Sequence, residues 1–77
     1  MQIEMRIFGD LRTYAKGSEK PLSIALHEDA TVEDILTAVG IPLEAVKVIF
    51  VNARQEKADC RLQEGDRVGI FPPSGGG

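Results

Sequence analysis

The residues of this sequence best suited to chemistry stand at its end, where two prolines are followed by a serine and three glycines. Glycine has no Cβ, so a glycine-ended chain can thread a narrow channel and leaves its last carbonyl open to attack. Proline lacks a backbone N–H and has a restricted φ, which stiffens the exit from the preceding segment. We therefore interpret Gly77 as the reactive group, with Gly76 beside it, and assign Pro72, Pro73 and Gly75 to a segment that a partner protein binds.

Two other reactive side chains have weaker claims. Cys60 stands in an acidic stretch, where nothing favours the thiolate form, and we interpret it as an inert thiol. His27 falls on the outward face of a predicted strand with no nucleophile beside it, and we interpret it as a solvated histidine. One cysteine and one histidine cannot build a zinc or iron–sulfur site, so we expect no metal and no bound cofactor.

The composition bounds the classes of function. The chain has 77 residues, of which 43% are hydrophobic and 27% charged, as in one small globular domain. Nine basic and twelve acidic residues give a net charge of -3, the wrong sign for a general binder of nucleic acid or of anionic membranes. No apolar run approaches the ~20 residues of a membrane span, and no signal peptide is recognisable. We expect a cytoplasmic protein that is non-catalytic on its own.

Hydrophobic periodicity predicts the elements that must position the glycine-ended tail. Four segments have the alternation or the β-branched composition of strands: residues 1–8, 22–26, 47–51 and 67–71. Residues 52–55 are predicted to form a turn. Residues 56–63 are weakly patterned, and we expect a short edge strand there, followed by a loop in which Leu62 enters the core.

One helix is predicted over residues 31–39, where apolar side chains recur at helical spacing. Thr31 and Asp34 have the spacing of a capping box, and Gly40 suits the left-handed position at the helix end. This order of elements predicts an α+β domain of the β-grasp type over residues 1–71, with a mixed sheet of four or five strands packed on the helix and a flexible tail over residues 72–77. The predicted core comprises Ile3, Met5, Ile7, Leu22, Ile24, Leu26, Val32, Ile35, Leu36, Val39, Val48, Phe50, Leu62, Val68 and Ile70.

An apolar docking patch is predicted beside the tail. Alternation that places Val48 and Phe50 inward leaves Ile49 and Val51 facing outward, and it places Phe71 outward at the end of the last strand. If these strands are neighbours, Ile49, Val51 and Phe71 form one patch that a partner would bind. Two alternatives stay open: a bulge would reverse the two faces, and the same residues could simply cover an under-packed edge of the sheet.

Several short motifs together carry a family resemblance: Arg6-Ile7-Phe8, Leu11-Arg12, residues 30–36, Val51-Asn52, residues 64–68 and residues 71–77. On these motifs the whole chain resembles the ubiquitin-like sulfur carriers, which include the small subunit of molybdopterin synthase and the thiamine-pathway sulfur carrier. The Pro72-Pro73 pair is more similar to the molybdopterin synthase small subunits. Gly75 departs from the family pattern, in which alanine or another small residue is frequent.

The resemblance implies a function for the tail. A separate activating enzyme would use ATP to adenylate the carboxylate of Gly77, and a sulfur donor would then convert it to a thiocarboxylate. The large subunit of molybdopterin synthase would accept that sulfur for a pterin precursor. Alternatives remain: a carrier for the thiamine pathway, a ubiquitin-like modifier joined to lysines through Gly77, and a β-grasp interaction domain that is no carrier.

Overall fold

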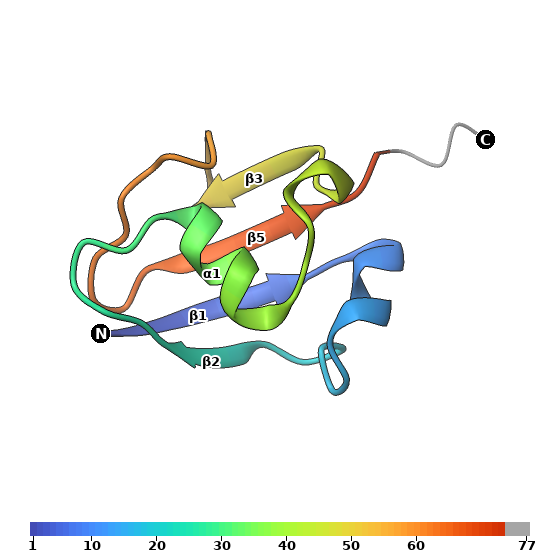
Figure 1. Cartoon of the computed structure of the whole chain (residues 1–77), viewed down its shortest axis with the longest axis horizontal. Coiled ribbons are helices and arrows are strands. Elements are labelled where there is room, and N and C mark those ends of the chain that lie inside the picture. The colour runs from blue at the N-terminus through green and yellow to red at the C-terminus, as the bar shows by residue number, and fades with distance from the viewer. Residues whose placement is uncertain (74–77) are drawn as a thin grey trace.

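The computed structural model describes residues 1–73, and residues 74–77 lie outside the described part of the chain. In the described residues, one α-helix lies across one face of a five-stranded sheet (Figure 1). The strands are β1 (Gln2–Ile7), β2 (Leu22–Ala25), β3 (Val48–Val51), β4 (Arg54–Glu56) and β5 (Arg67–Phe71). The α-helix is α1 (Val32–Val39), and two 3₁₀ helices, η1 (Gly9–Tyr14) and η2 (Leu43–Ala45), lie in the connections.

The first and last strands lie side by side within the sheet. The strand order is β2-β1-β5-β3-β4, in which β1 and β5 are parallel and the other neighbours are antiparallel. After the β1–β2 hairpin the chain crosses the sheet through α1 to reach β3 (Figure 1). This is the β-grasp, ubiquitin-like fold, and both the mixed sheet and the pairing of residues 67–71 with the first strand are confirmed.

Local signals set both ends of α1. The Asp34 N–H donates to the Thr31 hydroxyl at 3.3 Å, and the Thr31 N–H donates to the Asp34 carboxylate at 2.8 Å. This capping box satisfies N–H groups that have no partner within the helix. Gly40 follows the last turn with a φ of 82°, in the left-handed region that favours glycine. The predicted helix is therefore confirmed. No helix in residues 1–73 is long and apolar enough to cross a membrane.

The buried face of β3 is the opposite of the predicted one. Ile49 and Val51 are each only 7% exposed and lie in the core, whereas Val48 and Phe50 are half-buried on the other face. Register is the cause, because Ile49 pairs with the fully buried Ile70 of β5 and paired residues point to the same face. Ile49 and Val51 are therefore not part of an exposed docking patch, and that prediction is wrong.

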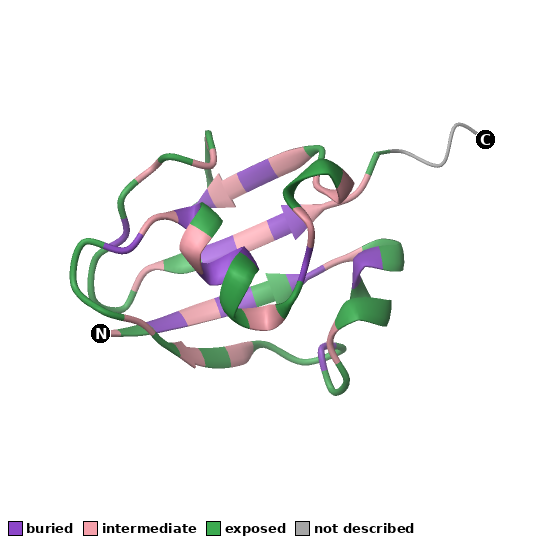
Figure 2. Ribbon diagram, viewed as in Figure 1, coloured by how far each residue is buried: buried purple, intermediate pink, exposed green. Residues whose placement is uncertain are grey.

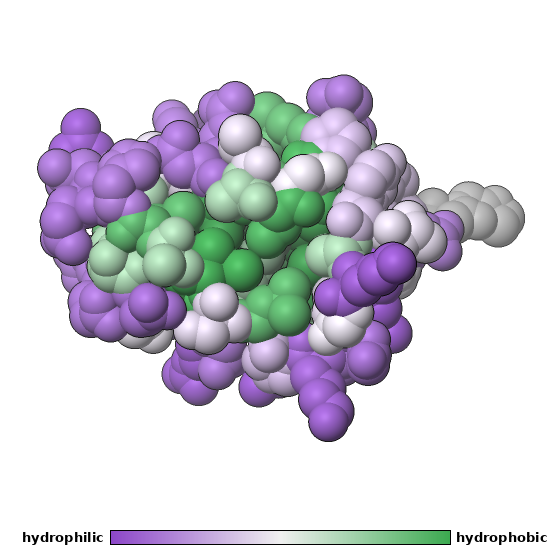
Figure 3. Space-filling model, turned by 60° about the horizontal axis from the view of Figure 1, so that its bottom comes forward, coloured by the Kyte–Doolittle hydropathy of each residue, from purple (hydrophilic) through white to green (hydrophobic). Residues whose placement is uncertain are grey.

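Most of the remaining core was predicted correctly. These predicted residues are buried: Ile3, Met5, Ile7, Val32, Ile35, Leu36, Leu62, Val68 and Ile70. These buried residues were not predicted: Leu11, Ala30 and Ile41. The predicted core residues Leu22, Ile24, Leu26 and Val39 are only half-buried (Figure 2). Helix α1 lies in front of β5 and β1 (Figure 1). On the side of edge strand β2, the surface of the molecule shows a broad apolar area (Figure 3).

The turn between β3 and β4 is tighter than predicted. It consists of Asn52 and Ala53, whose φ values are 52° and 69°. Positive φ at both central residues suits the twist of an antiparallel hairpin. Arg54 and Gln55, predicted to lie in the turn, instead begin β4. An edge strand therefore exists, but it is Arg54–Glu56 rather than part of residues 56–63, and only two residues separate it from β3. The turn can be this short because Ala53 takes a conformation more typical of glycine or asparagine.

Candidate functional site

Three phenylalanine rings cluster on the sheet face opposite α1. Phe8 follows β1, Phe50 lies in β3 and Phe71 ends β5. The rings of Phe8 and Phe71 stack, with centroids 4.3 Å apart and an interplanar angle of 3°. The Phe50 ring meets that of Phe71 edge-on, with centroids 5.8 Å apart and an angle of 82°. Both geometries are favourable for aromatic pairs, and we call Phe8, Phe50 and Phe71 the aromatic face.

Gly69 forms the floor beneath two of these rings. A Cβ at this position would lie 3.6 Å from the Phe8 ring and 3.8 Å from the Phe71 ring, so both rings rest close above the strand. The three phenylalanines are half-buried and keep part of their apolar surface in contact with solvent. Because β3 and β5 are neighbours and Phe50 pairs with Gly69, the aromatic face is one continuous surface rather than three isolated side chains.

One member of the aromatic face is predicted from the sequence. Phe71 faces outward, as predicted, and is not covered by the helix. The prediction that Phe50 lies in the core is wrong, for the reason given for β3. Phe8 is not among the predicted site residues, although the sequence carries a signal for it: the outward positions of residues 2, 4 and 6 continue by alternation to residue 8.

Arginine side chains border the aromatic face. A hollow of about 300 Å³ is lined by Arg6, Phe8, Phe50, Ala53, Arg67, Val68, Gly69 and Phe71. The Arg6 Nε lies 3.2 Å from a carboxylate oxygen of Glu4, and both side chains are well exposed, so this ion pair adds little stability. Aromatic residues and arginine are the residue types enriched in protein–protein interfaces. The surface therefore has the composition of a protein-binding site.

The predicted tail begins at one end of the aromatic face. The Lys47 N–H donates to the Phe71 carbonyl at 2.8 Å, and Pro72, which has no N–H, ends the pairing of the strand. Pro72 is half-buried and Pro73 is exposed. A hollow of about 620 Å³ surrounds this point and is lined by Gly9, Asp10, Lys47, Val48, Phe71, Pro72 and Pro73. We call Pro72 and Pro73 the tail root.

Phe71, Pro72 and Pro73 are consecutive in the chain and line the same hollow. Their role in partner binding stays a prediction. The division into a domain over residues 1–71 and a tail over residues 72–77 likewise stays a prediction. Three of the predicted site residues lie outside the described residues: Gly75, Gly76 and Gly77.

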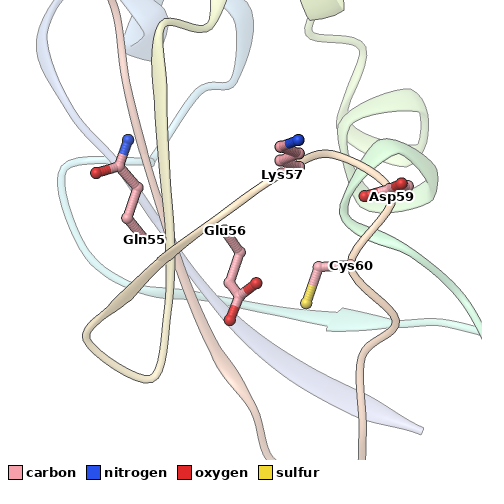
Figure 4. A pocket seen from close by; sticks show the side chains of 5 residues that line it. All are labelled: Gln55, Glu56, Lys57, Asp59 and Cys60. Carbon is pink, nitrogen blue, oxygen red and sulfur yellow. The ribbon is translucent and has the colours of Figure 1, made fainter.

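Cys60 lies away from the tail root, in the loop after β4 (Figure 1). It lines a hollow of about 470 Å³ with Gln55, Glu56, Lys57 and Asp59, and its thiol points toward Glu56 (Figure 4). Burial raises the pKa of the Cys60 thiol, and the carboxylates of Glu56, Asp66 and Asp59 raise it further. A raised pKa lowers the thiolate fraction at neutral pH. These surroundings agree with the interpretation of Cys60 as an unreactive thiol.

His27 is exposed beside the start of α1. One ring nitrogen lies 2.8 Å from the Glu28 carbonyl oxygen, and the other lies 3.7 Å from a carboxylate oxygen of Asp34. No nucleophilic side chain is among these contacts, which agrees with a solvated histidine. Within residues 1–73, no group of three or more histidine, cysteine, aspartate or glutamate side chains is arranged to hold a metal ion.

The structure is similar to several solved small proteins. SAMP1 of Haloferax volcanii has a TM-score of 0.78 and 23% identity, with all of both chains covered. A Pyrococcus furiosus protein provisionally identified as subunit 1 of a molybdopterin converting factor has a TM-score of 0.74 and 28% identity, with 95% of this chain and 98% of that chain covered. The complex of subunits 1 and 2 of the Helicobacter pylori molybdopterin-converting factor contains a chain with a TM-score of 0.65 and 20% identity, with all of both chains covered.

Family membership comes from the sequence as a whole. No curated protein matches this chain significantly. The family model described as Mut7-C ubiquitin, in contrast, matches residues 1–75. That match spans the sheet, the helix, the aromatic face and the tail root. The chain therefore belongs to the Mut7-C ubiquitin family of ubiquitin-like proteins.

Proposed function

We propose that this protein is a sulfur carrier for molybdopterin synthesis, and that the carboxylate of Gly77 carries the sulfur. The observation that carries the proposal is the continuity of the aromatic face with the tail root, because Phe71 belongs to the first and directly precedes the second. The glycine-ended sequence and the 28% identity to the Pyrococcus furiosus protein also support it.

The chemistry takes place on the last residue. A carboxylate oxygen of Gly77 attacks the α-phosphorus of ATP in an activating enzyme, which releases pyrophosphate and forms an acyl-adenylate. A hydrosulfide equivalent then attacks the acyl carbon, AMP leaves with the electron pair of the broken C–O bond, and a thiocarboxylate remains. In this proposal the activating enzyme and a large synthase subunit supply the acids and bases for these steps.

The aromatic face has a separate task in this proposal. Ordering an extended tail in a partner's channel costs roughly 1–2 kcal/mol of backbone entropy per residue. The globular body must therefore contribute contacts close to the point where the tail begins. Phe71 and its neighbours provide apolar area at that point, and Arg6 and Arg67 on the same face suit a partner with an acidic border.

A mass measurement tests the proposal directly. In protein isolated from its own host, a fraction of the molecules in which Gly77 is the free C-terminus should have one oxygen of the Gly77 carboxylate replaced by sulfur. Deletion of Gly76-Gly77 should abolish adenylation and leave the unfolding temperature nearly unchanged, since the described core lies within residues 3–70. The Cys60→Ser variant should still acquire sulfur.

Other outcomes would overturn this function. Sulfur that survives the Gly76-Gly77 deletion but vanishes in Cys60→Ser would assign it to the thiol. Lysine-linked conjugates of Gly77, with no thiocarboxylate, would identify a protein modifier instead. That second function has some support in the similarity of the fold to SAMP1, which is also named small archaeal modifier protein 1.

A further inference from the structure

The backbone of Gly9 lies directly against the ring of Pro72. A Cβ on Gly9 would stand 2.8 Å from the Pro72 Cγ and 3.2 Å from its Cδ. Optimal contact between carbon atoms is at about 3.5–4.0 Å, so a side chain at this position would displace the proline ring. Gly17 has a similar positive φ, 78° against 61° for Gly9, but a Cβ on Gly17 would meet nothing within 4 Å.

This contact is the last of three successive contacts between the same two segments. The Phe8 N–H donates to the Ile70 carbonyl at 3.1 Å. One step further along, the Phe8 ring stacks on the Phe71 ring. Gly9 then meets Pro72. The two segments therefore stay in contact for two more residues beyond Ile7 and Ile70, the last pair of β1 with β5.

We propose that Gly9 is a positioning residue that sets the direction in which the tail leaves the aromatic face. Proline has a nearly fixed φ, so the position of the Pro72 ring largely determines the direction of the backbone that follows it. Only a residue without a side chain at position 9 leaves room for the Pro72 ring in this position. The consequence for adenylation rests on the proposed function, whereas the contact itself does not.

The structural half of the test compares Gly9→Ala with Gly17→Ala by NMR. Both variants place alanine at a positive φ and should lose similar stability for that reason. In the unsubstituted protein and in Gly17→Ala, nuclear Overhauser contacts should link the Pro72 ring protons to the α-protons of residue 9. In Gly9→Ala these contacts should weaken strongly while the pairing of β1 with β5 persists. Unchanged Pro72 contacts in Gly9→Ala would overturn the inference, whether or not the protein carries sulfur.

The functional half measures ATP–pyrophosphate exchange with the activating enzyme. A reactive group displaced by about 1 Å can lose up to ~100-fold in rate, so we expect kcat for Gly9→Ala to fall by roughly tenfold. The KM should change little, because the aromatic face is intact; loss of folded carrier would instead raise KM. Gly17→Ala should resemble the unsubstituted protein in both values.

A second variant keeps the inference testable if Gly9→Ala folds poorly. Pro72→Ala removes Cγ and Cδ, the two atoms that a Cβ on residue 9 would strike. We expect Pro72→Ala to lower kcat by itself, and the addition of Gly9→Ala to lower it no further. Independent, multiplying losses would refute the positioning role. Absence of exchange with the unsubstituted protein would instead refute the proposed function and leave the NMR result to decide on Gly9.

Discussion

The side-chain amide of Asn52 donates a hydrogen bond of 2.9 Å to a carboxylate oxygen of Asp66. The other Asp66 oxygen accepts from the Gln63 N–H at 2.8 Å, and the Asn52 side-chain oxygen accepts from the Arg67 N–H at 3.0 Å. The turn after β3 and the turn before β5 therefore hold each other at the end of the sheet remote from the tail root. Two of the motifs that define the family resemblance meet in this contact.

Replacing Asp66 by alanine should destabilise the protein. The change removes hydrogen bonds to Asn52 and Gln63 and leaves their donors without this partner, so we expect a loss of about 1–2 kcal/mol in the free energy of unfolding. Urea denaturation at neutral pH measures it. Glu19→Ala, which removes an exposed acid from the first loop, is the control and should leave the midpoint unchanged. Equal midpoints for the two variants would contradict the prediction.

Thr31→Ala should also lower stability, by about 1 kcal/mol, because it removes the side-chain acceptor of the Asp34 N–H at the start of α1. Thr37→Ala is a matched change within the same helix. The Thr37 hydroxyl donates only to the Glu33 carbonyl, at 3.1 Å on an exposed face, and alanine is the better helix former. Thermal unfolding should place the Thr31 variant below the original protein and the Thr37 variant at or above it.

Phe71→Ala should weaken binding to the activating enzyme or to a synthase subunit by at least about 1 kcal/mol, as expected for an aromatic residue central to an interface. Titration calorimetry with the partner measures this loss. Lys16→Ala, in the first loop, should bind like the original protein. Circular dichroism at the assay temperature should show that both variants are folded. Unchanged affinity of a folded Phe71 variant would exclude the aromatic face as the docking surface.

Cys60 should react slowly with iodoacetamide. Because the pKa of Cys60 is raised, its thiolate fraction at pH 8 is lower than that of an unstructured cysteine peptide. The increase of the reaction rate with pH should therefore occur at a higher pH than in the peptide. Glu56→Gln removes one carboxylate that raises the pKa and should accelerate the reaction. Glu44→Gln, an exposed acid in η2, should not change the rate. A rate equal to that of the free peptide would contradict the raised pKa.

Features that depend on a few neighbouring residues could be read from the sequence. The capping box of Thr31 and Asp34 and the end of α1 at Gly40 follow from interactions within one or two helical turns. The inward faces of β1 and β5 follow from alternation of apolar with polar or small residues, which leaves one choice of buried face. The glycine-ended tail and the two prolines before it were equally plain.

The face of β3 could not be read in this way. All four of its residues are apolar, so no alternation distinguishes the inner face, and its pairing with β5 decides that Ile49 rather than Phe50 enters the core. The length of the turn after β3 also could not be read from the sequence. Ala53 carries no glycine-like signal, yet the hairpin geometry holds it at a positive φ.

The sequence by itself determined which residue types the glycine-ended tail offers, where the α-helix forms and the order of the strands along the chain, because each rests on residue types or on spacing within a short segment. The tertiary structure alone decided that Phe8 meets Phe71 and that Gly9 meets Pro72. Those pairs are more than sixty residues apart along the chain. They are brought together only by the parallel register of β1 against β5, which the packing of the whole core sets.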